Sequence, residues 1–482
     1  MIVGRIKEKK QLEKAYRSKE AEFVVVYGRR RVGKTYLIRE YFSRKKCLFM
    51  HVTGVDRGAL KTQLSKFSEA LSKTYFNEAP LEVPSSWDNA FKLLNKQITD
   101  NPNKKTVIFL DELPWLATRR SGLLQTIDYY WNHHWSQLKN VVLVVCGSSA
   151  SWMIKNIIYD KGGLHNRASC EICLLPFTLQ DTKEFLKSRN VRLSNRHILS
   201  LYMALGGIPF YLKYIESGLT SDQNIQHIIF DENAPLKDEF NKLFRSLFNN
   251  ADVYIELITL LSKKKCGMTR SEIQSIAKLS TNGGRLTERL NDLCRAGFIV
   301  EHVAWQKQTG EYYKVIDEFC LFYLHWVGFK KSERFMKNHW LEQSRSQSYE
   351  SWAGYAFESI CFKHVDRVIS ALDIKCGGTI DSWRFIPRKH AENGAQIALL
   401  IDRNDDAITL CEIKHSDKPF VIDKSYAAQL ENKIKIFKEK TQTNKHIFLN
   451  LISASDVKRN QYFNALIQGV VILDDLFTTG DA

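Results

Sequence analysis

Apolar runs alternate with amphipathic stretches over the first 180 residues of the chain. Residues 59–74 and 87–99 have the spacing of amphipathic helices. The continuous apolar runs, rich in β-branched and aromatic residues, are Phe23–Tyr27, Cys47–Val52, Thr106–Asp111, Val141–Gly147 and Cys170–Leu175. Runs that are apolar on both faces are typical of buried parallel strands. The alternation of strands and helices therefore predicts an α/β domain with a parallel sheet.

The pattern changes after residue 250. Thr269-Arg-Ser-Glu272 is a capping-box signature, and Leu286, Leu290 and Leu293 place an apolar stripe on a second helix. Residues 298–305 and 312–316 then predict a hairpin across a turn at 308–310. Helix, helix and hairpin predict a winged helix. Its basic residues could read a DNA groove, or the module could be a packing or regulatory element; those residues are Arg285, Arg289 and Arg295.

The C-terminal third repeats the mixture of helices and strands. Residues 329–352 are rich in Lys, Arg, Ser and Gln, which predicts a linker or solvated helix and a domain boundary. Trp352–His364 is helical in pattern, and Gln396–Asp402 with Ala407–His415 predicts a β-hairpin. A further helix is expected at Tyr426–Lys438.

Composition narrows the class of protein. A chain of 482 residues is too long for one core, and its net charge of +17 favours a polyanionic partner, nucleic acid first, although a solvated basic surface alone can produce it. The start has no segment of signal-peptide type, and no apolar run of about 18 residues occurs. We therefore expect a cytoplasmic protein with no membrane partner. The ten cysteines suit reduced thiols, and the lone C-x-x-C, Cys170 and Cys173, has no second ligand pair.

A phosphate-binding loop follows the first strand. Gly28, Gly33, Lys34 and Thr35 match G-x-x-x-x-G-K-[ST]. The glycines let backbone N–H groups turn toward phosphate oxygens, the lysine adds a positive charge, and the threonine hydroxyl can bind Mg²⁺. The sequence therefore predicts ATP and Mg²⁺ as cofactors, with the loop residues Gly28, Arg29, Arg30, Arg31, Val32, Gly33, Lys34 and Thr35 around the nucleotide.

Other candidate residues follow the later strands. Asp111 and Glu112 end a buried strand, where Asp111 would hold Mg²⁺ through water and Glu112 would polarise the attacking water. Ser148 or Ser149 could sense the γ-phosphate or cap the next helix. Arg167 is a candidate arginine finger, acting in cis or from a neighbouring subunit in a possible homo-oligomer.

Together these motifs resemble a family of bacterial and archaeal AAA+ ATPases related to the STAND group. The resemblance rests on Val-Gly-Arg near the start, the phosphate loop, Phe-Leu-Asp-Glu, Cys-Gly-Ser-Ser, His-Asn-Arg, Leu-Pro-Phe and Gly206-Gly-Ile-Pro-Phe-Tyr211, and covers roughly residues 1–330. It implies a five-stranded parallel sheet with the acidic strand set apart from the phosphate-loop strand, followed by a helical lid. It also implies that Gly207 and Pro209 lie close to the nucleotide.

The hairpin near the C-terminus brings a second set of polar residues together. A turn centred near residues 404–405 places residue 398 opposite Glu412 and on one face with Lys414, with cross-strand Cβ atoms about 5 Å apart. Two carboxylates at this spacing could share one Mg²⁺, and a lysine beside them could orient water or stabilise the phosphorane.

This constellation resembles the PD-(D/E)XK restriction-endonuclease-like superfamily, and more narrowly the C-terminal domain usually fused to the ATPase family above. The resemblance implies that Glu358 is the helix carboxylate, Glu412 a metal ligand and Lys414 the catalytic lysine, with Gln429 a weaker match to a supporting position.

One position departs from the family pattern. Ala398 stands where the metal-binding Asp is expected, and Asp402, four residues on, lies roughly 13 Å from that place. Either the site is a natural relic or the chain carries an inactivating substitution. In both cases the sequence predicts that the chain cleaves little or nothing.

We therefore expect an α/β chain with five segments: a P-loop AAA+ ATPase core over 1–185, a helical lid over 186–250, a winged helix over 251–325, a basic linker over 326–352 and a PD-(D/E)XK nuclease-like domain over 353–482. The predicted function is ATP binding and hydrolysis that regulates a Mg²⁺-dependent nuclease on DNA or RNA, with anti-phage defence as an analogy. The alternative is a nucleotide-switched DNA-binding regulator without nuclease activity.

Overall fold

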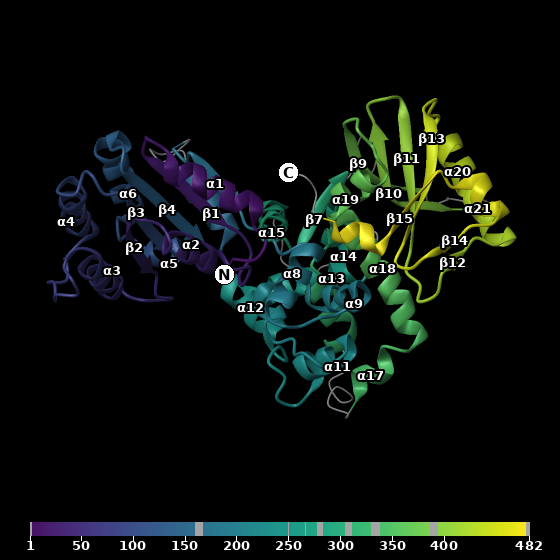
Figure 1. Ribbon diagram of the computed structural model, residues 1–482, viewed down its shortest axis with the longest axis horizontal. Helices are drawn as coiled ribbons and strands as arrows, with labels where there is room; N and C mark the ends of the chain where they lie inside the picture. The colour runs from purple at the N-terminus through teal and green to yellow at the C-terminus, as the bar shows by residue number, and fades with distance from the viewer. Residues whose placement is uncertain are drawn as a thin grey trace. The chain divides into compact units, whose positions relative to one another are not determined.

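The computed structural model divides the chain into two compact units. It describes residues 2–159, 167–248, 250–265, 267–276, 283–303, 311–328, 338–385 and 394–478. Unit 1 contains Met1–Pro176 and Asn291–Gly297, and unit 2 contains Phe177–Leu290 and Phe298–Ala482. Figure 1 labels the helices and strands of both units.

Unit 1 is built on a five-stranded parallel sheet with the order β2-β3-β4-β1-β5. Its strands are β1 (Glu22–Tyr27), β2 (Leu48–Thr53), β3 (Thr106–Asp111), β4 (Val141–Gly147) and β5 (Cys170–Cys173). The side chains of β3 and β4 are all buried, as their continuous apolar runs predicted. β4 lies between the phosphate-loop strand β1 and the acidic strand β3, which confirms the expected strand order.

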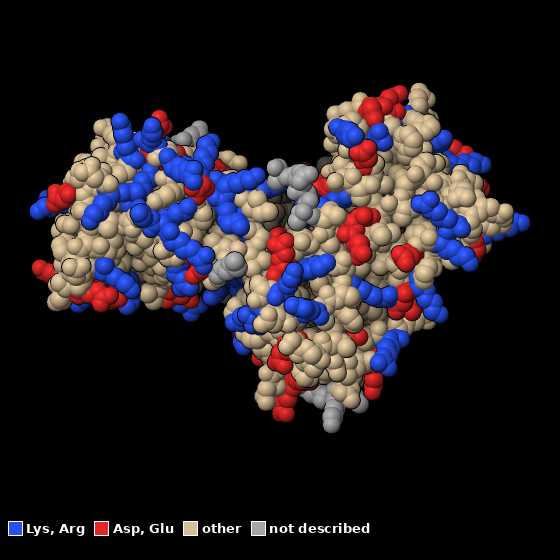
Figure 2. Space-filling model, in the orientation of Figure 1, with Lys and Arg blue, Asp and Glu red and all other residues tan. Residues whose placement is uncertain are grey.

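Helices cover both faces of this sheet, and the bounds predicted for two of them hold closely. The helices are α1 (Ile6–Arg17), α2 (Lys34–Phe42), α3 (Leu60–Tyr75), α4 (Trp87–Thr99), α5 (Leu113–Leu116), α6 (Leu123–His133) and α7 (Ala150–Met153). Phe67, Trp87 and Phe91 pack their rings together beside the sheet. Lys and Arg side chains gather on the side of this unit where α1 lies (Figure 2).

Unit 2 begins with a group of helices that follows the ATPase sheet. They are α8 (Leu179–Ser188), α9 (Asn195–Leu205), α10 (Pro209–Leu212), α11 (Ser221–Ile225) and α12 (Glu239–Leu247). Capping boxes begin two of them, with Thr178 and Asp181 at α8 and Thr220 and Gln223 at α11. We call α8–α12 the helical lid.

The predicted hairpin module has the expected order of elements. α13 (Ala251–Ser262) precedes β6 (Met268–Thr269), α14 (Arg270–Ile276), α15 (Gly283–Arg295), β7 (Ile299–Val303) and β8 (Glu311–Val315). β8 pairs antiparallel with both β6 and β7. Thr269 and Glu272 form the capping box that the sequence predicted, with N···O distances of 2.9 and 3.2 Å.

The segment expected to be a linker or solvated helix is helical but partly buried. After α16 (Glu318–Phe322), the described residues form α17 (His339–Gln343) and the start of α18 (Gln347–Lys363). Trp340 is 1% exposed and packs on Phe230 and Phe322, with ring centroids 5.5 and 4.9 Å apart. Aromatic side chains thus anchor this segment to the helical lid, which the abundance of polar residues around them concealed. The basic cluster at 329–337 lies outside the described residues.

The C-terminal domain is a mixed five-stranded sheet with the order β15-β13-β11-β10-β9. Its strands are β9 (Gly378–Phe385), β10 (Ala395–Arg403), β11 (Ala407–Lys414), β13 (His446–Ser453) and β15 (Gly469–Ile472), with β12 (Phe420–Val421) and β14 (Val457–Lys458) as a separate pair. α20 (Lys424–Thr441) and α21 (Gln461–Leu466) pack on the face that carries Leu400 and Leu410. α18 and α19 (Val365–Ala371) complete the domain, with α18 packed on β10 and β11.

Candidate functional site

The phosphate loop has the backbone conformation that its glycines predicted. Gly28 and Gly33 have φ angles of 143° and 94°. A Cβ on Gly28 would lie 2.4 Å from the carbonyl oxygen of Leu174, so a side chain there would clash with the backbone beside β5. The loop then enters α2 at Lys34, and the helix N-terminus faces the space where phosphate groups would bind.

The Lys34 side chain is buried within the phosphate loop. Its ammonium group donates to the carbonyl oxygens of Gly28 at 2.9 Å and Arg29 at 3.0 Å, and the residue is 5% exposed. Among the other loop residues, Arg29 and Val32 are buried, and the Arg30 guanidinium lies 5.7 Å from the ring centroid of Trp115. Lys34 therefore bonds to the backbone of its own loop. A bound phosphate would offer the ammonium group charged partners instead.

Thr35 and Asp111 form the part of the site that suits Mg²⁺. The Thr35 hydroxyl donates to the two Asp111 carboxylate oxygens at 3.1 and 2.9 Å. His51 on β2 lies 3.7 Å from the same carboxylate, which is 1% exposed. A hydroxyl and a buried carboxylate are oxygen ligands of the kind that Mg²⁺ uses together with water and phosphate. These two residues fit the ion, which would neutralise charge on the phosphates.

The Glu112 carboxylate is held by Ser148, which the sequence gave as a candidate sensor of the γ-phosphate. The backbone N–H of Ser148 donates to Glu112 Oε2 at 3.0 Å, and its hydroxyl donates to the same oxygen at 2.8 Å. Ser149 occupies the N-cap position of α7, so Ser148 does not cap that helix. Glu112 has a φ of 49°, an uncommon backbone conformation that is found preferentially at functional sites.

Arg5 stabilises the phosphate loop, a role that its residue type alone did not predict. Its guanidinium donates to the carbonyl oxygen of Val32 in the phosphate loop at 3.1 Å and to that of Leu175 at 2.6 Å. The side chain is buried, and the backbone φ is 56°. The only signal in the sequence was the Val-Gly-Arg motif. Arg5 thus ties the start of α1 to the loop that would hold the nucleotide.

Arg167 does not lie beside the phosphate loop of its own chain. Cys170 pairs with Val24, and Ser169 donates its N–H to the carbonyl oxygen of Phe23 at 2.9 Å. The chain therefore enters β5 at the edge of the sheet where β1 begins, whereas the loop follows the other end of β1. Arg167 is exposed there. A role in cis has no geometric support, and a role toward a neighbouring subunit stays a prediction.

Two other predicted features have local explanations. Pro209 begins α10, and Gly207 lies so close to Phe177 that a Cβ would approach its carbonyl oxygen within 1.9 Å. Both residues belong to unit 2, and their contact with nucleotide stays a prediction. The nine cysteines that the structure describes are free thiols, and Cys170 and Cys173 point to opposite faces of β5 because they are three positions apart along the strand.

The hairpin of the C-terminal domain has the register that the sequence predicted. β10 pairs with β11 through Leu399 with Cys411 and Leu400 with Leu410, so residue 398 is next in line with Glu412. The pairing of β10 with β9 shifts between Ile397 and Leu400, which places a bulge beside Ala398. Bulges commonly redirect side chains next to active sites. Sequence pattern gave no sign of this bulge.

Glu412 is enclosed by cationic and hydroxyl partners. Its carboxylate lies 3.1 Å from Lys414 Nζ and 2.6 Å from Lys433 Nζ, and it accepts a hydrogen bond from the Tyr426 hydroxyl at 2.5 Å. Burial favours a higher pKa for Glu412, but Lys433 and Lys414 together hold that pKa below its ordinary value. Lys433 and Tyr426 both lie on α20 and were not assigned from the sequence.

Glu358 lies within electrostatic range of the Glu412 carboxylate and the Lys414 ammonium group. Burial raises its pKa, Glu412 adds to the increase, and Lys314, Lys414 and Lys265 oppose it. The ammonium groups of Lys265 and Lys314, from the hairpin module, lie 5.4 and 5.2 Å from the ring centroid of Tyr355, one turn before Glu358 on α18. The structure thus brings Glu358, Glu412 and Lys414 to one place and adds two lysines to its border.

The residues present here do not fit a metal ion. The part of the chain that the structure describes contains no group of three His, Cys, Asp or Glu side chains able to hold one. Asp402 cannot replace the missing ligand, because its carboxylate accepts from Lys445 Nζ at 2.6 Å near the other end of β10. Gln429 is exposed on α20. Glu412 is left as a carboxylate paired with lysines.

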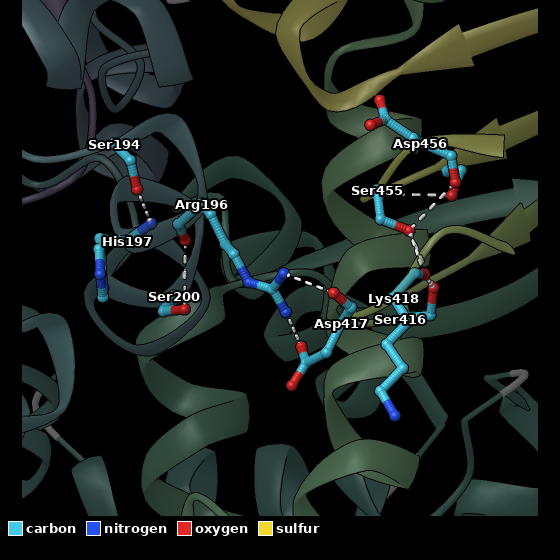
Figure 3. A network of polar contacts seen from close by, with 10 residues as sticks. Ser194, Arg196, His197, Ser200, Ser416, Asp417, Lys418, Ser455 and Asp456 are labelled. Carbon is cyan, nitrogen blue, oxygen red and sulfur yellow. Dashed lines mark hydrogen bonds and ion pairs between the residues drawn. The ribbon is translucent and has the colours of Figure 1, made fainter.

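The helical lid contacts the loops that follow the strands of the C-terminal sheet (Figure 3). Arg196 Nη1 donates to the carbonyl oxygen of Asp417 at 2.9 Å and also forms an ion pair with its carboxylate. Asn195 donates to Asp474 at 2.7 Å. A cleft of about 580 Å³ lies here, lined by Lys183, Ser194, Arg196, Asp417, Ser455 and Asp474 among others. Asp417 follows Lys414 by three residues, so the lid touches the segment next to the candidate catalytic lysine.

The parallel sheet, the phosphate loop and the Thr35–Asp111 and Glu112–Ser148 pairs define a P-loop ATPase. Residues 2–215 match a family described as an ATPase domain predominantly from Archaea. This part of the chain belongs to that family, and we conclude that it is an ATP-binding and ATP-hydrolysing domain of the archaeal type.

Individual relatives have little assigned function. An uncharacterized protein of Methanocaldococcus jannaschii is 24% identical over 367 residues, which cover 75% of this chain and 76% of that protein. An uncharacterized ATP-binding protein of the same organism is 44% identical over 46 residues, 10% of this chain and 78% of the other. A Walker-type ATPase of Pyrococcus abyssi aligns with a TM-score of 0.47 and 18% identity over 67% of this chain and 96% of the other.

Among the described residues, none of the helices combines the length and the apolar character needed to cross a bilayer.

Proposed function

We propose that the ATPase domain regulates a C-terminal nuclease-like site that acts on nucleic acid, and that this site is disabled by Ala398. The observation that supports the proposal is the Glu412–Lys414 pair at the end of β11, with residue 398 next in line with Glu412 and Glu358 on α18, the helix packed against β11. An Asp at 398 would supply the second carboxylate of a Mg²⁺ site, and the ion would activate water for attack on phosphorus.

The roles of the chain's own residues follow from their contacts. Lys414, which pairs with Glu412 in this chain, would lie beside the attacked phosphate and stabilise its developing charge. Lys433 and Tyr426 would keep the Glu412 carboxylate aimed at the site. In the present chain the two lysines instead neutralise a single carboxylate, so we expect nucleic acid to bind without efficient cleavage.

Control by ATP would pass through the helical lid. The lid follows the ATPase sheet in the chain and contacts Asp417, three residues after Lys414, and Asp474, which follows β15. A lid that moves with the nucleotide would shift these loops and so change access to Lys414. The combination of ATP control and nucleic-acid cleavage suits defence against phage, and we keep that role as part of the proposal.

The test is a cleavage assay on DNA and RNA with Mg²⁺. The variant Ala398→Asp should cleave, whereas Ala398→Asn, which has nearly the same size but no charge, should not. Adding Lys414→Ala to Ala398→Asp should abolish cleavage and leave binding intact. If Ala398→Asp cleaves neither substrate with or without ATP, the nuclease proposal fails.

A second candidate is a nucleotide-switched regulator that binds DNA and cleaves nothing. The observation that favours it is the paired state of Glu412 together with the lack of a metal-binding group among the described residues. Under this alternative, Ala398→Asp remains inactive and Lys34→Ala changes DNA affinity, because ATP binding alone sets the state of the protein.

A further inference from the structure

The positive charge of the chain is concentrated in the ATPase half. Residues 1–176 contain 29 Lys and Arg against 16 Asp and Glu, a net charge of +13 out of the total of +17. The remaining residues contain 41 against 37, so the C-terminal site lies in a nearly balanced region. We therefore expect the surface that binds a polyanionic partner to lie on the ATPase unit.

Helix α1 presents a row of cations to solvent. Lys7, Lys10, Lys14 and Arg17 are exposed, and their spacing of three, four and three residues places them on one face of the helix. The opposite face carries Leu12 and Ala15, which are buried where α1 contacts β1 and β5. The apolar side of α1 is thus used for packing, and the basic side is left facing water. We call these four residues the α1 stripe.

The acidic residues of α1 are engaged away from the stripe. Glu8 forms an ion pair with the buried guanidinium of Arg5 at 3.5 Å. Glu13 accepts from Lys45 Nζ at 2.5 Å and contacts Tyr41 and Arg17, and these partners lower its pKa to about 2. Within the stripe, Arg17 forms an ion pair with Glu13, and the ion pairs of the described residues include none for the other three side chains. Lys7, Lys10 and Lys14 give the stripe an excess of positive charge.

The basic surface continues beyond the end of the helix. The Tyr16 hydroxyl donates to the carbonyl oxygen of Lys46, and Lys105 donates to those of Ser18 and Lys139. The side chains of Lys46 and Lys139 are exposed. Figure 2 shows the resulting gathering of Lys and Arg on this side of the unit.

We propose that the α1 stripe binds the phosphodiester backbone of nucleic acid. The four side chains span about 15 Å along the helix axis, which corresponds to about four phosphates of one strand. Long lysine and arginine side chains can adjust to phosphate spacing without reading bases, so we expect little dependence on sequence. Membrane binding is less favoured, because an interfacial helix needs an exposed apolar face and α1 offers only Ile6.

The position of α1 connects this surface with the nucleotide site. Arg5 immediately precedes the helix and donates to the carbonyl oxygen of Val32 in the phosphate loop. Nucleic acid on the stripe would therefore act on a helix whose first turn is tied to the loop. If the two sites are coupled, ATP and nucleic acid change each other's affinity by the same factor.

The binding test uses fluorescence anisotropy with a labelled DNA duplex and a labelled RNA strand over a series of salt concentrations. The variant carries Lys7→Gln, Lys10→Gln, Lys14→Gln and Arg17→Gln. Affinity should fall at least about tenfold, and the slope of log K against log salt should become shallower by about 3. Substituting the three lysines by Arg should retain both. An unchanged ATP affinity would show that the variant is folded.

The matched control removes four exposed lysines from the C-terminal domain. Lys418→Gln, Lys424→Gln, Lys435→Gln and Lys438→Gln should leave affinity and slope close to those of the unmodified chain. Loss of binding in this control but not in the stripe variant would overturn the proposal and place nucleic acid on the C-terminal domain. Stripe-dependent binding to anionic phosphatidylserine vesicles without binding to DNA or RNA would also overturn it. The test does not depend on cleavage, so it stands apart from the nuclease proposal.

Discussion

Ser148 holds Glu112, the residue for which we propose a role in hydrolysis. Its two hydrogen bonds to one Glu112 oxygen hold that carboxylate at the carboxyl end of β3, beside the Thr35–Asp111 pair on the same edge of the sheet. A general base must be free to accept a proton from water, so binding of nucleotide has to loosen or redirect this contact. We therefore propose separable roles for Glu112, in hydrolysis, and Lys34, in binding.

We predict that Glu112→Gln lowers the rate of ATP hydrolysis at least about 100-fold while the protein still binds ATP. The amide keeps the size of the side chain and its hydrogen bond with Ser148 but cannot act as a base. Lys34→Ala should instead abolish ATP binding, because it removes the ammonium group inside the loop. Hydrolysis by purified protein and binding of a fluorescent ATP analogue separate the two. Near-normal hydrolysis by Glu112→Gln would contradict the assigned role.

His415 links the stability of the C-terminal domain to pH. Burial, aided by Arg196, lowers its pKa to about 4 in the folded chain. The unfolded histidine has a pKa of about 6.5 and takes up a proton first as the pH falls, so stability is lost below that pH. We predict a loss of about 2 kcal/mol from this residue between about pH 7 and about pH 5.

Urea denaturation at the two pH values checks this prediction. His415→Phe, which keeps the contact with Phe357, should show a pH-dependent loss smaller by that amount. His364 contributes in the same direction, because burial lowers its pKa and its Nε2 accepts a hydrogen bond from the Leu179 N–H. An identical pH dependence in the variant and the unmodified chain would refute the role of His415.

At the scale of elements, local periodicity predicted much of the fold. The parallel strands of unit 1 and the β10–β11 register could be predicted, because the sequence pattern of a buried strand or a short hairpin extends over only a few residues. The same reasoning brought Glu412 and Lys414 together. It could not supply Lys433, Tyr426 or Arg5, since their roles depend on contacts between segments far apart in the sequence.

The segment before α18 shows a second limit. Its polar composition predicted a linker or solvated helix, whereas Trp340 packs in an aromatic cluster with the lid. A few large apolar side chains outweigh many polar ones when they share one face. Such a face cannot be recognised without the element that covers it.

We predict that Trp340→Ala destabilises unit 2 by about 3 to 5 kcal/mol, because it leaves a large cavity between Phe230, Phe322 and Trp326. Glu342→Ala on the same helix is the control, and should change stability by less than about 0.5 kcal/mol. Urea unfolding and limited proteolysis report both. Equal stability of the two variants would mean that the aromatic cluster does not anchor this segment.

In the whole molecule, an ATPase site and a second polar site lie in different units of one chain. The ATPase domain holds a P-loop site whose residues are in place. The C-terminal domain holds the Glu412–Lys414 pair, for which we propose a nuclease-like role that Ala398 disables. Within unit 2, Arg196 of the lid contacts Asp417, three residues after Lys414, and this is the contact through which we propose control.

The most direct measurement of this central claim is Mg²⁺-dependent cleavage by Ala398→Asp, with and without ATP, beside the same protein carrying Lys34→Ala. We predict that ATP changes the cleavage rate of Ala398→Asp severalfold or more, and that the response disappears in Lys34→Ala while the protein remains folded. Cleavage at one rate in all four conditions would contradict control by the ATPase domain, and no cleavage in any of them would contradict the nuclease site itself.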